Sequence, residues 1–150
     1  MIKEIIFAFL ATLGFGITFE IRGKKLFFSC IVGSIGWVSY ILSLKLGYSL
    51  ILSYFIASII LTICSEILAR VLKTPVTSIL INGLIPLVPG GGIYYTMYFI
   101  LQKNMEQALF KGAETFLIAG ALSFGIVVVS SLVRIAETGR KNRYFRSLKN

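Results

Sequence analysis

The sequence predicts an all-α, polytopic membrane protein with five transmembrane helices, and three observations support this fold class. Of its 150 residues, 57% are hydrophobic and 14% are charged, whereas soluble domains have about 45–50% and about 25%. The chain contains five apolar runs, separated by charged residues, and most are close to the roughly 20 residues that a helix needs to cross the hydrocarbon core. The alternation of polar and apolar residues that is typical of membrane β-barrels does not run through the chain.

The five expected spans cover about residues 5–21, 26–44, 49–69, 76–101 and 112–133. Together they form a transmembrane domain over residues 1–133, followed by a basic cytoplasmic tail over residues 134–150. The first run begins beside Lys3 and Glu4 and has no small-residue cleavage site. We therefore expect a retained helix there and not a secretory signal.

The distribution of Lys and Arg predicts an outside N-terminus and an inside C-terminus, because basic residues accumulate in cytoplasmic loops. In this orientation the outer side holds four basic residues, and the inner side holds Arg22, Lys24, Lys25, Arg70, Lys73 and the six basic residues of the tail. The asymmetry disappears if the fourth segment is re-entrant, so we expect it to cross. The net charge of +9 is then spread over the inner loops and a basic tail that contacts anionic lipids, and we expect no nucleic acid partner.

The fourth segment carries the string PLVPGGG and is predicted to be a broken helix. Pro86 and Pro89 lack a backbone N–H and clash with the preceding turn, and the three glycines from Gly90 to Gly92 do not favour a helix. The break from Pro86 to Gly92 lies near the middle of the segment. Irregular backbone at that depth must be buried in protein or line a watery cavity.

This break is the candidate substrate site. A helix that resumes at about Gly91 or Gly92 would point its first N–H groups at an anion, while the carbonyl groups that end the preceding half-helix suit a cation. A small zwitterion satisfies both ends, as in discontinuous transporter helices. The candidate substrate-binding residues are Asn82, Pro86, Pro89, Gly90, Gly91, Gly92, Tyr94 and Tyr95.

Two further interpretations concern polar residues outside the break. Ser58, Thr62 and Glu66 are spaced four residues apart and form a stripe that is a possible polar path. Glu66 is also four residues before Arg70, which predicts an ion pair at the membrane interface. The break itself has a purely architectural alternative, in which it is a kink that neighbouring helices fill.

The composition also restricts the chemistry of the chain. It contains no histidine and no aspartate, so we expect no Ser/His/Asp triad, no metal site, no cofactor and no enzymatic activity. Cys30 and Cys64 each lie in an apolar run, where a cysteine is usually a small buried hydrophobic residue. No carboxylate is expected in the middle of the membrane, so any proton relay would depend on another subunit.

Three strings resemble the small subunit of the threonine/serine exporter family: VGSIGWVSY, SEILARVLKTPVT and GLIPLVPGGGIYYTM. The resemblance extends from about residue 10 to residue 130. It implies a bacterial cytoplasmic-membrane exporter of small amino acids that is driven by the proton gradient and works with a larger subunit. Pro86, Pro89, Gly90 and Tyr94 match the motif of the family. Some relatives are linked to export of dicarboxylates such as succinate.

The leading prediction is therefore a membrane subunit of a proton-driven threonine/serine exporter. Five helices make an odd number, so a following five-helix unit would have inverted topology, as in many transporters. We accordingly expect a larger homologous subunit or a homo-oligomer. The alternatives are a succinate exporter subunit, and a channel component or membrane scaffold without its own substrate site.

Overall fold

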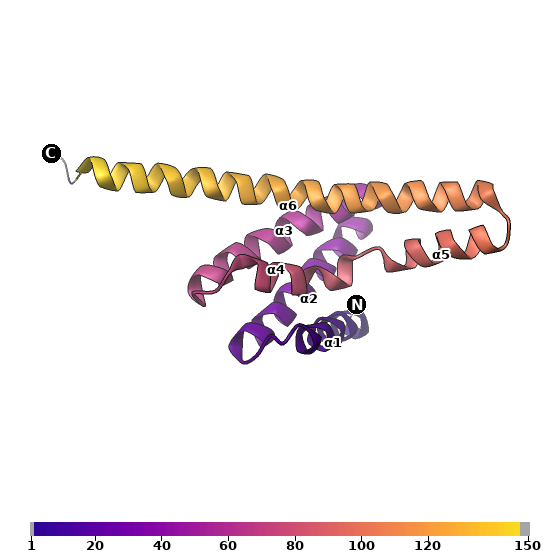
Figure 1. Ribbon diagram of the computed structural model, residues 1–150, viewed down its shortest axis with the longest axis horizontal. Helices are drawn as coiled ribbons and strands as arrows, with labels where there is room; N and C mark the ends of the chain where they lie inside the picture. The colour runs from indigo at the N-terminus through magenta and orange to yellow at the C-terminus, as the bar shows by residue number, and fades with distance from the viewer. Residues whose placement is uncertain (1, 148–150) are drawn as a thin grey trace.

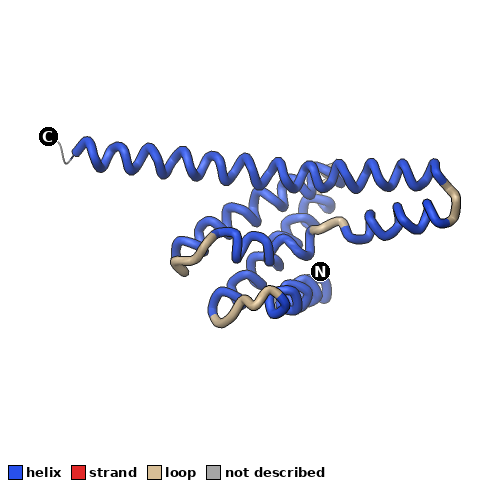
Figure 2. Tube along the Cα trace, viewed as in Figure 1, coloured by secondary structure: helices blue, strands red, loops and turns tan. Residues whose placement is uncertain are grey.

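The structure, a computed structural model, describes the backbone of residues 2–147 and the side chains of residues 2–136. In this part of the chain every regular element is helical, and Figure 2 shows no strand. In chain order the helices are α1 (Ile2–Thr18), α2 (Lys24–Lys45), α3 (Leu50–Val71), α4 (Val76–Leu84), the short 3₁₀ helix η1 (Ile85–Leu87), α5 (Gly90–Leu101) and α6 (Met105–Ser147).

Three helices of the described chain are long and apolar enough to cross a membrane: α2, α3 and the Met105–Ala136 part of α6. A fourth span is present if α4 and η1 form one crossing together with α5. Helix α1 has 17 residues, which is at the lower limit for a span. The protein is therefore a multi-pass helical membrane protein, and the predicted fold class is confirmed at this level.

Helices α2 and α3 form the centre of the fold (Figure 1). Helix α1 packs on α2, and α4 packs on both α2 and α3. Helix α6 packs along α3 on one side and continues beyond it as an antiparallel hairpin with α5. The buried core joins α2, α3, α4, η1 and α6 through apolar side chains, among them Val32, Leu61, Ile79, Leu87 and Leu122.

Two glycines allow the helices to approach closely. A Cβ atom on Gly33 of α2 would lie 2.5 Å from Thr12 Oγ1 of α1 and 3.2 Å from the carbonyl oxygen of Gly83 in α4. A Cβ atom on Gly125 of α6 would collide with Ser58 Oγ of α3. Such small residues are typical of helix contacts in membranes, because they bring the backbones together.

Four helices end in the same way. The second residue after each helix end has a positive φ: Glu20, Gly47, Lys73 and Lys103. After α5, for example, the Lys103 N–H donates to the Ile100 carbonyl at 3.0 Å, and the Asn104 N–H donates to the Phe99 carbonyl at 2.9 Å. This pair of bonds is the Schellman motif, which satisfies the last carbonyl groups of a helix.

The tail from residue 134 to residue 150 has no backbone boundary at its predicted start, because α6 continues as one helix from Met105 to Ser147. Of its basic residues, Arg140, Lys141, Arg143, Arg146 and Lys149 have side chains outside the described residues.

Candidate functional site

The helix is interrupted at Val88 and Pro89, inside the predicted segment. Val88 is extended, with φ −62° and ψ 128°, as the residue before a proline usually is. Pro89 has φ −76° and ψ 55°, and the Gly90 N–H donates to the Val88 carbonyl at 2.7 Å. Pro89 is therefore the centre of an inverse γ-turn. The axes of the two flanking helical pieces, Val76–Leu87 and Gly90–Leu101, differ by 50°.

The first turn of α5 presents unpaired amides. The helix starts at Gly90, one residue before the earliest expected position, and no side chain caps it. Because the Gly90 N–H bonds to Val88 and the Ile93 N–H bonds to Pro89, the amides of Gly91 and Gly92 are the first-turn donors that remain. Nothing lies within 4 Å of a Cβ atom placed on Gly90 or Gly91, whereas one on Gly92 would collide with Thr115 of α6, so the turn is open on the side of Gly90 and Gly91.

The tyrosines that follow are on the surface of the described chain. Tyr94 and Tyr95 are 64% and 51% exposed, and their rings make an edge contact with centroids 5.3 Å apart. Helix α5 has no buried residue, and its main contact is with α6. The open amides and the tyrosines thus belong to a helix that is covered only on the side that faces α6.

Asn82 lies in a different environment from the rest of the predicted site. Its side chain is fully buried between α4, α2 and α1: Asn82 Nδ2 donates to Ser29 Oγ of α2 at 2.7 Å and lies 2.8 Å from a Cβ atom placed on Gly16 of α1. The structure therefore divides the predicted residues into two groups. Asn82 faces α1 and α2, whereas Gly92 of α5 faces α6 and the other predicted residues of α5 lie on the surface of the described chain.

Trp37 of α2 lies beside the break, and the sequence argument did not identify it as a site residue. Its indole Nε1 is buried and has no hydrogen-bond partner in the described chain. Trp37 and Pro86 line one cavity of about 270 Å³, together with four residues of α1: Glu4, Phe7, Ala8 and Ala11. Pro86 and Trp37 are far apart in the sequence and form no motif, so only the fold shows that they line the same cavity.

The two hydroxyls of the stripe Ser58, Thr62 and Glu66 are hydrogen-bonded within their own helix, α3. The Ser58 hydroxyl donates to the Phe55 carbonyl at 2.8 Å and the Thr62 hydroxyl to the Ser58 carbonyl at 2.6 Å. Both side chains are fully buried, an arrangement expected of packing residues. The predicted pair of Glu66 and Arg70 is confirmed, with 3.7 Å between Glu66 Oε2 and Arg70 Nη2.

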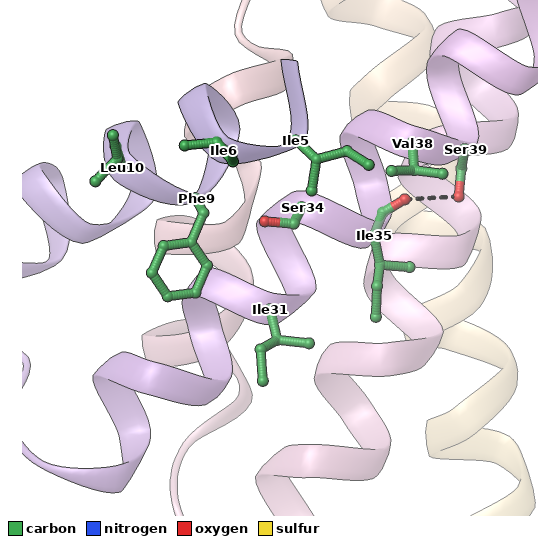
Figure 3. Close-up of a pocket in the computed structure, with 9 residues that line it drawn as sticks. All are labelled: Ile5, Ile6, Phe9, Leu10, Ile31, Ser34, Ile35, Val38 and Ser39. Carbon is green, nitrogen blue, oxygen red and sulfur yellow. Dashed lines mark hydrogen bonds between the residues drawn. The ribbon is translucent and has the colours of Figure 1, made fainter. Parts of the chain in front are cut away.

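A separate apolar groove of about 490 Å³ lies between α1 and α2 (Figure 3). Its lining includes Ile5, Phe9 and Ile35, with Ser34 and Ser39 as the polar members. Ser34 donates to the Cys30 carbonyl and Ser39 to the Ile35 carbonyl. Because these hydroxyls are satisfied, the groove suits lipid chains better than a polar solute. Within the described residues, no group of three or more His, Cys, Asp or Glu side chains is placed to hold a metal ion.

A bundle of membrane-length helices with one interrupted helix is a feature of many membrane transport proteins. Comparison with known proteins then gives the family. Residues 4–132 match the family model described as Threonine/Serine exporter, ThrE. The chain belongs to this exporter family, and the resemblance seen in the sequence is confirmed.

One curated relative is an uncharacterized protein of Haemophilus influenzae, which is 22% identical over 136 residues. The match covers 85% of this chain and 46% of the relative, so the chain spans about half the length of that protein. No solved structure matches the chain.

Proposed function

We propose that the chain is one subunit of a proton-driven exporter of small amino acids, threonine or serine, in the bacterial cytoplasmic membrane. The substrate contacts the break from Pro86 to Gly92. Five spans place the N-terminus outside and the C-terminus inside, with α1 as the first span and the bent pair as the fourth. The basic tail contacts anionic lipids. The role is transport and involves no enzymatic reaction.

The observation that carries the proposal is the open first turn of α5. The amides of Gly91 and Gly92 have no partner in their own helix. A lipid-facing position would leave each of them unsatisfied, at a cost on the order of several kcal/mol for each group. A carboxylate that accepts from both amides removes this cost. The same carboxylate chemistry would serve succinate, which is the alternative substrate.

The exposed surface of α5 also supports a partner subunit. Helix α5 has no buried residue and leaves Gly90, Gly91 and its tyrosines uncovered, so a second subunit must cover this side within the membrane. The curated relative of Haemophilus influenzae is about twice as long as the matching region, which favours a larger homologous subunit over a homo-oligomer. We expect the coupling proton to be carried by groups of that subunit, since Glu66 pairs with Arg70 and no carboxylate is expected in the middle of the membrane.

Efflux from loaded proteoliposomes tests the function. Protein reconstituted with and without its larger subunit is compared for release of labelled threonine, serine and succinate, with and without an imposed proton gradient. We expect gradient-dependent release of threonine or serine only when both subunits are present. Release of succinate alone would support the alternative substrate, and release of none of the three would favour a scaffold. Blue-native electrophoresis of the solubilised protein checks for the complex, and an active monomer would contradict the partner proposal.

A further inference from the structure

A cavity between α4 and the turn that follows α1 is lined by a second set of polar groups. It has a volume of about 380 Å³ and is lined by Phe19, Ile21, Thr77, Ser78, Ile81 and Asn82. A neighbouring cavity of similar volume shares Phe19, Ile21 and Ser78 with it and adds Glu20, Arg22 and Lys25. Together they form a cleft between the α1–α2 turn and the first turn of α4, which we call the α4 cleft.

The inner end of the α4 cleft holds an unsatisfied acceptor. The Ser29 hydroxyl donates to the Leu26 carbonyl at 2.8 Å, so its oxygen must accept from Asn82, and the amide orientation of Asn82 is fixed with Nδ2 toward Ser29 at 2.7 Å. Asn82 Oδ1 is then left buried with no hydrogen-bond partner in the described chain. A buried carbonyl oxygen of this kind requires a donor.

The outer end of the α4 cleft has the opposite character. Arg22 and Lys25 outnumber the single acid there, Glu20. Helix α4 begins after Pro75 with no side-chain cap, and the Ser78 N–H already donates to the Pro75 carbonyl at 3.2 Å. The amides of Val76 and Thr77 and the positive end of the helix dipole therefore remain available to an anion.

The geometry points to the α4 cleft as a binding site for a solute that carries a carboxylate and an ammonium group a few ångströms apart. The carboxylate lies at the first turn of α4, near Ser78, Arg22 and Lys25, and the ammonium group donates to Asn82 Oδ1. Ser78 and Asn82 are four residues apart, about 6 Å along the helix axis, which a small α-amino acid with two hydrogen bonds spans. Phe19 and Ile81 are 49% and 54% exposed, so they can move as the solute reaches Asn82.

This inference rests on the proposed function, to which it adds a second substrate site. In the proposed orientation the α1–α2 turn and the start of α4 face the cytoplasm, the side from which an exporter takes its substrate. The α4 cleft is then the loading site, and the break at Pro89 is reached later in transport. Unlike the break, the α4 cleft distinguishes an amino acid from a dicarboxylate, because a second carboxylate offers no donor to Asn82 Oδ1.

Equilibrium binding to the detergent-solubilised protein, with its larger subunit present, tests the site. The ligands are L-threonine and 3-hydroxybutyrate, which keeps the carboxylate and the hydroxyl but lacks the ammonium group. We expect 3-hydroxybutyrate to bind about tenfold or more weakly than L-threonine. We also expect Asn82→Ala to weaken L-threonine binding by a similar factor while leaving 3-hydroxybutyrate almost unchanged.

The charged end has a matched control on the same turn. The double variant Arg22→Gln, Lys25→Gln should weaken both ligands by about tenfold, whereas Lys24→Gln, an exposed lysine that does not line the cleft, should leave both unchanged. These residues are exposed, so the test holds even if Asn82→Ala fails to fold. Equal binding of both ligands by the wild type, or an equal effect of Lys24→Gln and of the double variant, would overturn the site. If these binding effects are absent but efflux still depends on the break, only this inference fails; if wild type neither binds nor exports any amino acid, the proposed function fails with it.

Discussion

The substitution Gly91→Leu separates the transport role of the break from its structural role. A Cβ atom at Gly91 meets nothing within 4 Å, so the new side chain causes no collision within the chain. Leucine is also a better helix former than glycine by roughly 0.5–1 kcal/mol. The fold of the subunit should therefore keep its stability or gain slightly.

The same side chain covers the first turn of α5 and blocks a carboxylate from the amides of Gly91 and Gly92. Each hydrogen bond to a charged group contributes about 1.5–3 kcal/mol, so losing two of them costs about 3–6 kcal/mol. At about 1.4 kcal/mol for each factor of ten, substrate affinity should fall by at least about 100-fold. Efflux should then fall by at least about tenfold at substrate concentrations that just saturate the wild type.

The assay combines efflux from proteoliposomes with thermal unfolding of the purified protein. Gly92→Ala is the matched control, because a Cβ atom there collides with Thr115 of α6. It should lower the thermal stability by an amount typical of overpacking, about 1–3 kcal/mol. Wild-type efflux by a well-inserted Gly91→Leu protein would refute the reasoning and favour a kink without a substrate site.

Three other substitutions test separate parts of the structure. Glu66→Gln removes a partly exposed ion pair and should cost no more than about 1 kcal/mol in stability while efflux continues; a selective loss of proton dependence would show that the glutamate takes part in coupling. Gly125→Ala should lower the unfolding temperature, because the new methyl group meets Ser58 and lies 3.1 Å from the Phe55 carbonyl oxygen, whereas Gly120→Ala, which has open space, should not. Lys103→Gly should stabilise the protein by about 1 kcal/mol, because Lys103 has a φ of 57° that glycine adopts without strain; an unchanged unfolding temperature would contradict this.

The interruption of the fourth segment follows from the sequence because its causes are local. Pro89 lacks the N–H that a continuous helix needs, and Pro89 also forces Val88 into an extended conformation. Neither effect depends on distant residues. The ion pair of Glu66 and Arg70 is local in the same sense, since one helical turn separates the two residues.

The division of the candidate site is not local and does not follow from the sequence. Asn82 and Gly91 are close in the chain, but the turn at Pro89 directs them toward different helices. The partner of Asn82 is Ser29, which is 53 residues away, and Trp37 reaches Pro86 only through the packing of α2. Such contacts depend on which helices are neighbours, and hydropathy patterns do not determine this.

The contact between α5 and α6 is made by small residues on both helices. Gly92 of α5 faces Thr115 of α6, and Gly112 of α6 faces Thr96 of α5, with 3.4 Å between a Cβ atom at Gly112 and Thr96 Cγ2. Each threonine thus sits over a glycine of the other helix, where a Cβ atom at Gly92 would already collide with Thr115. A lengthwise shift of α5 against α6 would bring side chains to the places where these glycines now lie, so the seam fixes the register of the two helices.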